Sequence, residues 1–199
     1  MYNRNDTESI LSIILLLVTG YLSWLYYVNK EHEYVMAGDG KPYRVQIGED
    51  NKQAANLLSK AISRVKTLLA HLQKIEPNDF RTETLSQRFN PDNITENAPS
   101  ERENGTTSYT VNKGEKIVVC LRQKNGDFVD INTLMYVIVH ELAHISDVKS
   151  HQHDERFWKN FEWLLSHSID IGIYTYVDYK KEEEPYCGMN ITSNVIDDY

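Results

Sequence analysis

The stretch His140-Glu141-Leu142-Ala143-His144 decides how this chain is interpreted, because two histidines four residues apart flank a glutamate. The apolar run before it, residues 134–139, predicts that the stretch lies on a helix. On a helix the two imidazoles project from one face, where they can bind a single zinc ion. Glu141 is then placed to act on a water at that ion. The pattern indicates a metal-dependent hydrolase.

A third zinc ligand is expected downstream, because a catalytic zinc ion usually takes three protein ligands and leaves one position for water. His153 is favoured, since a turn between two helices would swing it back over the first pair. Three alternatives remain open on the residues alone: His151 in the preceding loop, Glu162 on the next helix, and His167 near the end of that helix.

Composition limits the class of protein. The 199 residues carry 21 basic and 29 acidic side chains, a formal net charge of −8, and their number predicts one domain plus an appendage. No basic patch is large enough to predict direct nucleic-acid binding. Cys120 and Cys187 form neither a disulfide framework nor a zinc-binding pair, and a reduced compartment is the simpler interpretation, with a single bridge left open.

Residues 9–28 contain no charged side chain, and a helix of that length spans the hydrocarbon core of a bilayer. We expect an uncleaved membrane anchor rather than a signal peptide, because the start is not basic and no small-residue cleavage site follows. Lys30, Lys41 and Arg44 follow the segment and only Arg4 precedes it. This bias predicts that the rest of the chain lies on the cytoplasmic side of a membrane, such as a virion membrane.

The rest of the chain predicts an α+β fold, with helices packed on a small sheet. Alternating and helical hydrophobic patterns indicate two hairpins, expected at residues 34–47 and 108–121, and three long helices. The helices are expected at residues 50–75, over the stretch that carries His140, and at residues 154–168. Asp50 is expected to cap the first of these helices, and Asp130 or Asn132 the second. Residues 80–106 are expected to be irregular apart from a short helix at 85–89.

Three parts of the chain follow from these patterns. Residues 1–30 form the anchor, residues 31–185 a catalytic domain, and residues 186–199 a loosely ordered C-terminal tail. Within the domain, residues 174–179 are expected to form a strand and residues 181–185 a solvated break.

These residues resemble the WLM-type zinc metallopeptidases, and most closely short membrane-anchored forms found in large DNA viruses. The resemblance covers residues 31–192 and rests on the zinc-binding stretch and on several shorter matches: Tyr109–Gly114, Cys120–Arg122, Asn132–Met135, His153 with Phe157 and Trp158, Gly172–Tyr174, and Tyr186–Gly188.

The resemblance implies a zincin-like fold in which zinc is held by His140, His144 and His153, with Glu141 as the catalytic base. One departure concerns spacing, since eight residues separate His144 from His153 where many members of the family have five. The implied activity is that of an endopeptidase acting on a protein or peptide substrate.

The expected mechanism is hydrolysis of a peptide bond by a zinc-activated water. Glu141 takes the proton of that water and passes it to the leaving amine. Tyr186 and Tyr174 are the two tyrosines named as a second donor to the developing oxyanion. Residues 116–121 are expected to form the strand along which an extended substrate pairs.

A non-catalytic membrane or virion protein with a structural zinc site is the alternative. A structural site is closed by a fourth protein ligand, which His151 or Cys187 could supply. Glu141 favours the enzyme, because a structural site has no use for a base at that position.

Overall fold

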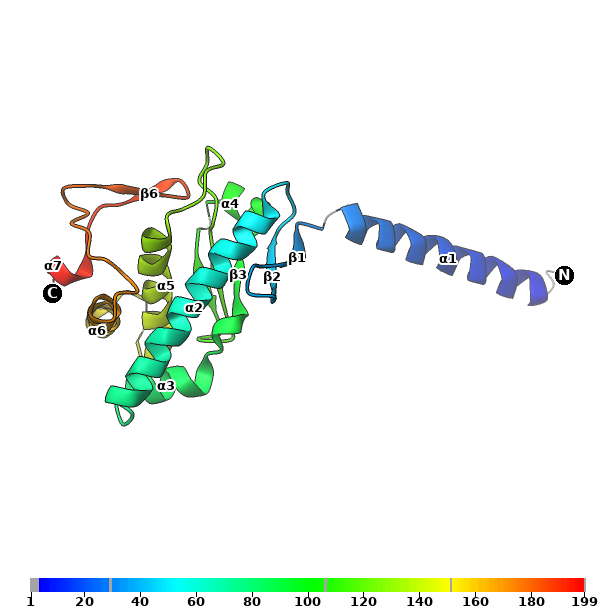
Figure 1. Cartoon of the computed structure of the whole chain (residues 1–199). Coiled ribbons are helices and arrows are strands. Elements are labelled where there is room, and N and C mark those ends of the chain that lie inside the picture. Colours follow the sequence, from blue (N-terminus) through cyan, green and yellow to red (C-terminus); the bar gives the residue numbers. More distant parts are fainter. Residues whose placement is uncertain (1–3, 29, 106, 151, 199) are drawn as a thin grey trace. The chain divides into compact units, whose positions relative to one another are not determined.

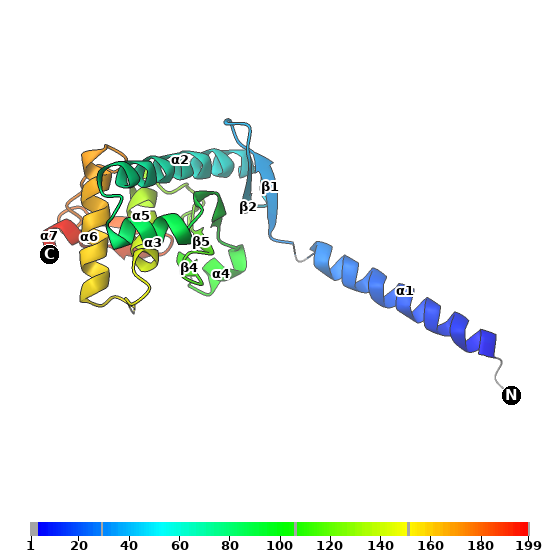
Figure 2. The ribbon, with the colours of Figure 1, turned by 90° about the horizontal axis from the view of Figure 1, so that it is seen from below.

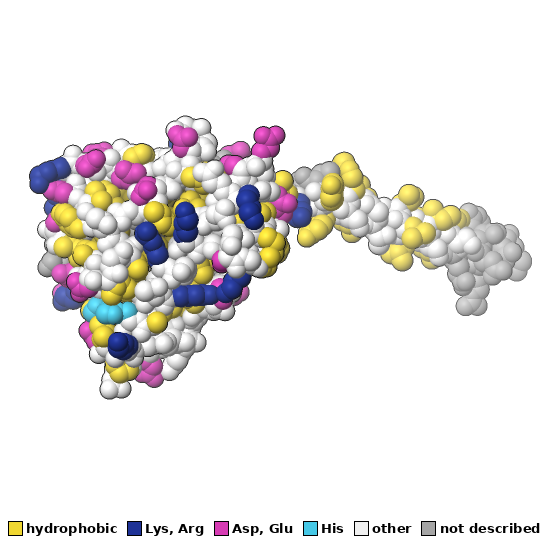
Figure 3. Space-filling view, in the orientation of Figure 1, with side chains coloured by type: hydrophobic (Ala, Val, Ile, Leu, Met, Phe, Trp, Pro, Cys, Tyr) yellow, Lys and Arg dark blue, Asp and Glu magenta, His cyan; other side chains and the backbone are white. Residues whose placement is uncertain are grey.

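The computed structural model describes residues 4–28, 30–105, 107–150 and 152–198. It divides into two compact units, Met1–Glu31 and His32–Tyr199, and each is described by itself. The first unit contains helix α1 (Arg4–Val28), in which Ser9–Tyr27 has a mean hydropathy of 1.9. By length and composition this helix can cross a membrane. Hydrophobic and uncharged side chains cover its described surface (Figure 3).

The second unit is built on a three-stranded sheet in which β5 lies between β3 and β4. β5 pairs in parallel with β3 and antiparallel with β4, and the strands span Ile94–Glu96 (β3), Tyr109–Val111 (β4) and Lys116–Val119 (β5). A separate antiparallel hairpin precedes the sheet, formed by β1 (His32–Met36) and β2 (Pro42–Gln46). Three long helices pack with these strands: α2 (Asn51–Ile75), α5 (Ile131–Ser146) and α6 (Glu155–Asp170). The predicted α+β class is confirmed.

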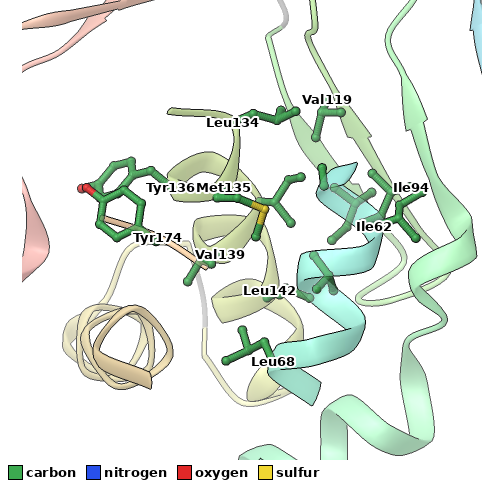
Figure 4. Packing of buried hydrophobic residues seen from close by; sticks show 14 of the residues in the cluster. Ile62, Leu68, Ile94, Val119, Leu134, Met135, Tyr136, Val139, Leu142 and Tyr174 are labelled. Atoms are coloured by element: carbon green, nitrogen blue, oxygen red, sulfur yellow. The ribbon is translucent and has the colours of Figure 1, made fainter. Parts of the chain in front are cut away.

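Helix α5 forms the centre of the hydrophobic core, with α2 on one side and α6 on the other (Figure 1). Its apolar stripe is fully buried, as its helical spacing predicts: Leu134, Ile138, Leu142 and Ile145 are each 0% exposed. In Figure 4, Met135 and Leu142 point toward α2, whereas Tyr136 lies against Tyr174 on the opposite side. α6 runs across the C-terminal end of α2 (Figure 2). The central helix is therefore fixed on both flanks.

The region expected to be irregular contains more structure than predicted. α3 begins at Phe80 and ends at Arg88, so it is longer than the predicted short helix. A 3-10 turn (Pro91–Asn93), β3 and the short α4 (Pro99–Glu103) follow it. β3 has only three residues, and its partner β5 lies more than twenty residues further along the chain. A local hydrophobic pattern does not reveal such a strand.

Two predictions for the C-terminal part are wrong. No strand forms at residues 174–179, where Tyr174 and Tyr179 instead turn inward and are each 1% exposed. The chain from Tyr186 onward is not a loose tail, because β6 (Glu184–Tyr186) and β7 (Met189–Ile191) form a hairpin and α7 (Val195–Asp198) follows. Tyr186, Cys187 and Val195 are buried and belong to the core.

The expected cap of α2 is also wrong. Asp50 precedes the helix but makes no side-chain cap hydrogen bond. Its carboxylate instead pairs with Arg122, at 2.8 Å from Nη2. A partner 72 residues away in the chain cannot be inferred from a local capping pattern.

The two cysteines are not free thiols: Cys120 and Cys187 form a disulfide. The interpretation of two reduced cysteines is therefore wrong, and the bridge joins the end of β5 to the turn of the β6–β7 hairpin. Gln123 reinforces this connection, because its side chain accepts from the Cys187 amide at 2.7 Å and donates to the Pro185 carbonyl at 2.6 Å. The hairpin is thus fastened to the segment that follows β5.

Candidate metal centre

Helix α5 presents His140 and His144 side by side, one turn apart on the same face. Their ring centroids lie 5.0 Å apart. Of the two predicted caps of this helix, Asp130 is the one that the structure uses, because its side chain accepts a hydrogen bond from the Asn132 amide at 2.7 Å. The buried stripe on the opposite face fixes the rotation of the helix, so both imidazoles face away from α2.

A tight loop after α5 brings His153 back over the first two histidines. Asp154 caps α6 by accepting from the Phe157 amide at 2.8 Å, and it also accepts from the Ser150 hydroxyl at 2.9 Å. Lys113, in the β4–β5 turn, donates to the Ser150 carbonyl at 2.7 Å. These contacts hold the loop on both sides of His153.

The three imidazoles converge on one point. One nitrogen from each of His140, His144 and His153 lies within 4.8 Å of the other two, and the Nε2 atoms of His140 and His153 are 3.1 Å apart. The buried ring of Phe157 supports all three, with centroid distances of 4.8, 4.3 and 4.7 Å. Three imidazole nitrogens at such spacing fit the ligand requirements of a tetrahedral zinc ion with one open position.

Burial keeps the imidazoles of His140 and His144 in the form that binds a metal. Desolvation, with smaller contributions from the neighbouring histidines, lowers the pKa of His140 to about 3. Desolvation also lowers the pKa of His144 to about 4. Neutral imidazole has a free lone pair on one nitrogen, so these two side chains can bind a divalent cation at neutral pH.

The other proposed ligands lie elsewhere. His167 is on the far part of α6, where its Nε2 is 3.5 Å from Glu76, and Glu162 does not join the histidine group either. Cys187 is held in the disulfide, and His151 falls outside the described residues. Within the described ranges, the group of histidine, cysteine and acidic side chains that could hold a metal has three members.

Glu141 is buried beside the three histidines and is 5% exposed. Desolvation raises the pKa of its carboxyl to about 7. The hydroxyl of Thr110, on the edge strand β4, donates to Glu141 Oε2 at 2.8 Å and opposes this rise. A carboxyl with a pKa near neutrality can accept a proton and release it again, as a general base must.

A cavity of about 350 Å³ lies over the site. Its walls come from β4 and the β4–β5 turn on one side and from α5 and the loop before α6 on the other. His140, Glu141, His144 and His153 all line it, so the proposed metal ligands and the carboxylate open into the same space.

The two tyrosines named as oxyanion donors have different positions. Tyr174 is remote, because its hydroxyl bonds to Tyr179 and Asn194 in the core. Tyr186 lies near the site, but its hydroxyl is engaged with the Ser108 side chain at 2.5 Å and with the Cys120 backbone. Burial raises its pKa well above the ordinary range. Neither arrangement leaves a hydroxyl that points at the histidines.

Sequence reasoning missed two supporting residues, Thr110 and Phe157. The signal for Phe157 was present, since an aromatic residue four positions after His153 sits on the buried stripe of α6. Thr110 gave no signal, because only the tertiary fold brings β4 alongside α5.

The chain is similar to several known proteins. The sequence model of the WLM domain matches residues 43–194. Uncharacterized protein R325 of Acanthamoeba polyphaga mimivirus is 33% identical over 202 residues, which cover 96% of this chain and 99% of that protein. Uncharacterized protein 136R of Invertebrate iridescent virus 6 is 36% identical over 73 residues, or 35% of this chain and 40% of that protein.

Solved structures of Wss1 from Saccharomyces cerevisiae are also similar. One covers 62% of this chain and 83% of the yeast chain at 23% identity, with a TM-score of 0.47. A mutant form covers 64% and 87% at 22% identity, with a TM-score of 0.49. The match to the WLM domain spans most of the chain, and the chain therefore belongs to the WLM family. This is a family of zinc metallopeptidases, which supports a protease function and the use of zinc.

Proposed function

We propose that this protein is a zinc endopeptidase in which His140, His144 and His153 hold the metal and Glu141 is the general base. The observation that carries the proposal is the convergence of three imidazoles beside a buried glutamate in one cavity. Zinc, when bound, supplies a Lewis acid that acidifies a water and polarises a peptide carbonyl.

The chain's own residues supply the proton transfer. Glu141 accepts a proton at Oε1 or Oε2 and delivers it to the leaving amine, while the Thr110 hydroxyl holds the carboxylate in place. The structural-zinc alternative loses one of its two proposed fourth ligands, because Cys187 is disulfide-bonded.

The substrate strand is reassigned from the sequence prediction. β5 lies between β3 and β4, so it has no edge for an extended peptide. β4 is the outer strand on the side of the site, and Tyr109 and Thr110 line the cavity. We therefore propose that an extended substrate pairs with β4. The proposal includes no nucleic-acid partner, since the chain carries 29 acidic against 21 basic side chains. Figure 3 shows both kinds on one face of the His32–Tyr199 unit.

We further propose that residues 1–30 anchor the protein in a membrane and that the His32–Tyr199 unit is the catalytic domain. The support is the apolar length of α1 and the division of the chain after Glu31. The protein should then resist carbonate extraction and keep its N-terminus, and removal of residues 1–30 should leave a soluble domain. Recovery of a mature chain that begins after residue 28 would contradict this part.

The side of the membrane needs its own test. The basic residues after the segment favour a cytoplasmic domain, as proposed from the sequence, whereas a disulfide favours an oxidising compartment. Acid quenching of intact cells followed by alkylation of free thiols in denaturant distinguishes the two, because both cysteines are buried in the native fold. A cytoplasmic domain should show modified cysteines, and protection of both cysteines would place the domain on the other side.

The proposed activity is tested on the full-length protein in detergent micelles. One zinc ion per chain is expected by elemental analysis, and a peptide library that includes unfolded proteins should be cleaved at internal bonds. Removal of zinc with a chelator should abolish cleavage, and added zinc should restore it. A zinc-loaded protein that cleaves nothing in the library would favour the structural alternative.

A further inference from the structure

A second cavity, of about 340 Å³, adjoins the metal centre on the side of the β6–β7 hairpin. It shares His140, Glu141 and His153 with the first cavity. A side chain of a peptide lying across the histidines could therefore enter it without leaving the site. Its volume is within the range of cavities that bind small ligands or single side chains.

Seven of the fifteen residues that line this cavity are apolar or aromatic, and they come from α5, α6 and the β6–β7 hairpin: Tyr136, Val137, Trp158, Phe161, Tyr186, Met189 and Ile191. The other eight are polar, and among them Glu141 is the one acidic or basic residue besides the two histidines. A carboxylate that entered would lose its hydration without a cationic Lys or Arg among the described lining residues. An entering cation would meet only Glu141, whose carboxylate the proposed mechanism uses.

The polar tips of the two lining tyrosines are already engaged. The Tyr136 hydroxyl donates to the Ser193 carbonyl at 3.1 Å, and the Tyr186 hydroxyl bonds to Ser108 and Cys120. What these residues offer to the cavity is therefore ring carbon rather than a hydroxyl without a partner. Trp158 adds a further ring, which stacks on His153 with a centroid distance of 5.5 Å.

The hairpin wall is held rigidly in place. Its two-residue turn has a positive φ at both Cys187 (51°) and Gly188 (97°), the geometry of a tight hairpin turn, and Cys187 is bridged to Cys120. Gln123 adds two hydrogen bonds to the same turn region. A wall fixed at this point keeps the cavity at constant width, which a selective subsite requires.

We propose that this second cavity receives an apolar side chain, aromatic or branched aliphatic, of the residue next to the bond that is cut. The inference rests on the proposed peptidase function and names its substrate class. Burial of such a side chain favours the matching peptide over one with alanine at that position by about 10- to 100-fold in kcat/KM. Aspartate or lysine at the same position should be disfavoured more strongly.

The test uses full-length, zinc-loaded protein and a blocked peptide that the library shows to be cleaved. One residue beside the cleaved bond is varied through Phe, Leu, Ala, Asp and Lys. Val137→Phe fills the cavity from α5 and should lower the Phe-to-Ala ratio of kcat/KM at least about tenfold. Ile47→Phe is the matched control. It introduces the same phenylalanine side chain at a position that is 50% exposed and lies outside the cavity.

A second variant covers the case in which Val137→Phe fails to fold. Ile191→Ala widens the cavity from the hairpin and should raise the relative rate for Phe over Leu. An unchanged ratio in both variants, or a wild-type protein without apolar preference, would overturn the inference and leave the peptidase proposal standing.

Binding provides a readout that does not depend on turnover. Glu141→Gln protein is titrated calorimetrically with the intact Phe, Ala and Asp peptides, and affinity should fall in that order. If the wild-type protein cleaves nothing in the library, the same substitutions are made in a library peptide that binds to the protein. The same order of affinities would then leave the cavity assignment standing while the peptidase proposal fails. Equal affinities for the three peptides would overturn the cavity assignment.

Discussion

Glu96 and Glu141 are both buried glutamates, yet their surroundings differ. Glu96 is 0% exposed and is fully engaged, because it pairs with Arg122 and accepts from the Gln46 amide at 2.7 Å. Glu141 is 5% exposed and opens into two cavities, and in the described part of the chain its carboxylate accepts from Thr110. A carboxylate enclosed by a guanidinium and an amide joins elements together, whereas one left open to a cavity can exchange a proton.

Burial acts on the carboxyl groups of both Glu96 and Glu141, but the groups that oppose its effect on the pKa differ. Burial raises the pKa of each carboxyl. At Glu96 the guanidinium of Arg122 and the amide of Gln46 act against this and favour the ionised form. At Glu141 only a neutral hydroxyl opposes the effect, so the pKa reaches about 7. The difference between the two regions is therefore one of charge compensation.

One short segment serves both regions. Arg122 reaches Glu96 and Asp50, while its neighbours Cys120 and Gln123 hold the β6–β7 hairpin at the site. The polar cluster around Glu96 thereby fixes the segment after β5. The β6–β7 hairpin, which forms one wall of the second cavity, is bonded to this segment. Loss of a contact in this segment should therefore lower the stability of the fold around both glutamates, and the effects of changes in the two regions can be ranked.

The largest effect is expected from the metal ligands. His153→Ala should weaken zinc binding by more than about 100-fold, because loss of a ligand exceeds the usual cost of losing a supporting residue. Cleavage should fall close to background. His167→Ala on helix α6 is the control, since His167 lies beside Glu76 and away from the site. Zinc content after dialysis against a competing chelator is the measurement, and equal retention by both variants would contradict the ligand set.

Removal of the disulfide should have the next largest effect. Cys120 and Cys187 are 67 residues apart, and closure of a loop of that length corresponds to about 4 kcal/mol. The Cys120→Ser, Cys187→Ser double variant should lose about this much free energy of unfolding in urea titrations. Its Phe-to-Ala selectivity should also fall, because the hairpin wall is released. A double variant with wild-type stability and selectivity would show that hydrogen bonds alone hold the wall.

Glu96→Gln should affect stability and not chemistry. The change leaves Arg122 buried without its full counter-charge, which should lower the free energy of unfolding by about 3 kcal/mol. Asp50 continues to pair with Arg122 and limits the loss. The rate of cleavage per folded molecule should stay at the wild-type value. A large loss of rate in a folded Glu96→Gln protein would remove the distinction between the two glutamates.

The smallest effect is expected at Thr110. Thr110→Val removes a hydrogen bond to the ionised form of Glu141, which should lower the rate by about tenfold near neutral pH. The sign of the pH effect follows from the same bond: the hydroxyl lowers the pKa of Glu141, so its loss raises that pKa. The acidic limb of the rate profile should therefore move to higher pH. Thr110→Ser keeps the hydroxyl and should keep the wild-type profile.

The regions that sequence could predict are those with local patterns. The core face of α5, the buried stripe of α6 and the β1–β2 and β4–β5 hairpins follow from hydrophobic spacing, and the structure confirms them. The histidine pair on α5 follows from its own spacing. His153 depended on a turn whose direction only the fold reveals, with Asp154 and Lys113 holding the loop.

The features that sequence reasoning missed depend on distant partners. Asp50 was expected to cap a helix but pairs with Arg122, and β3 forms because β5 offers it an edge. Residues 174–179 have an alternating pattern, yet Tyr174 packs on Tyr136 and turns into the core. The order of residues 186–198 comes from the disulfide and from the Tyr186 hydroxyl, both of which join positions more than 60 residues apart.

Glu141→Gln tests the central claim most directly, because it changes the proposed base without touching a proposed ligand. Zinc content and thermal stability should stay near the wild-type values, since glutamine has the same size and can still accept from Thr110. Glutamine cannot take the proton, so the rate of cleavage should fall by about 10²- to 10⁴-fold or more. Equal rates for the wild-type and Glu141→Gln proteins, with one zinc ion bound in each, would show that Glu141 is not the base.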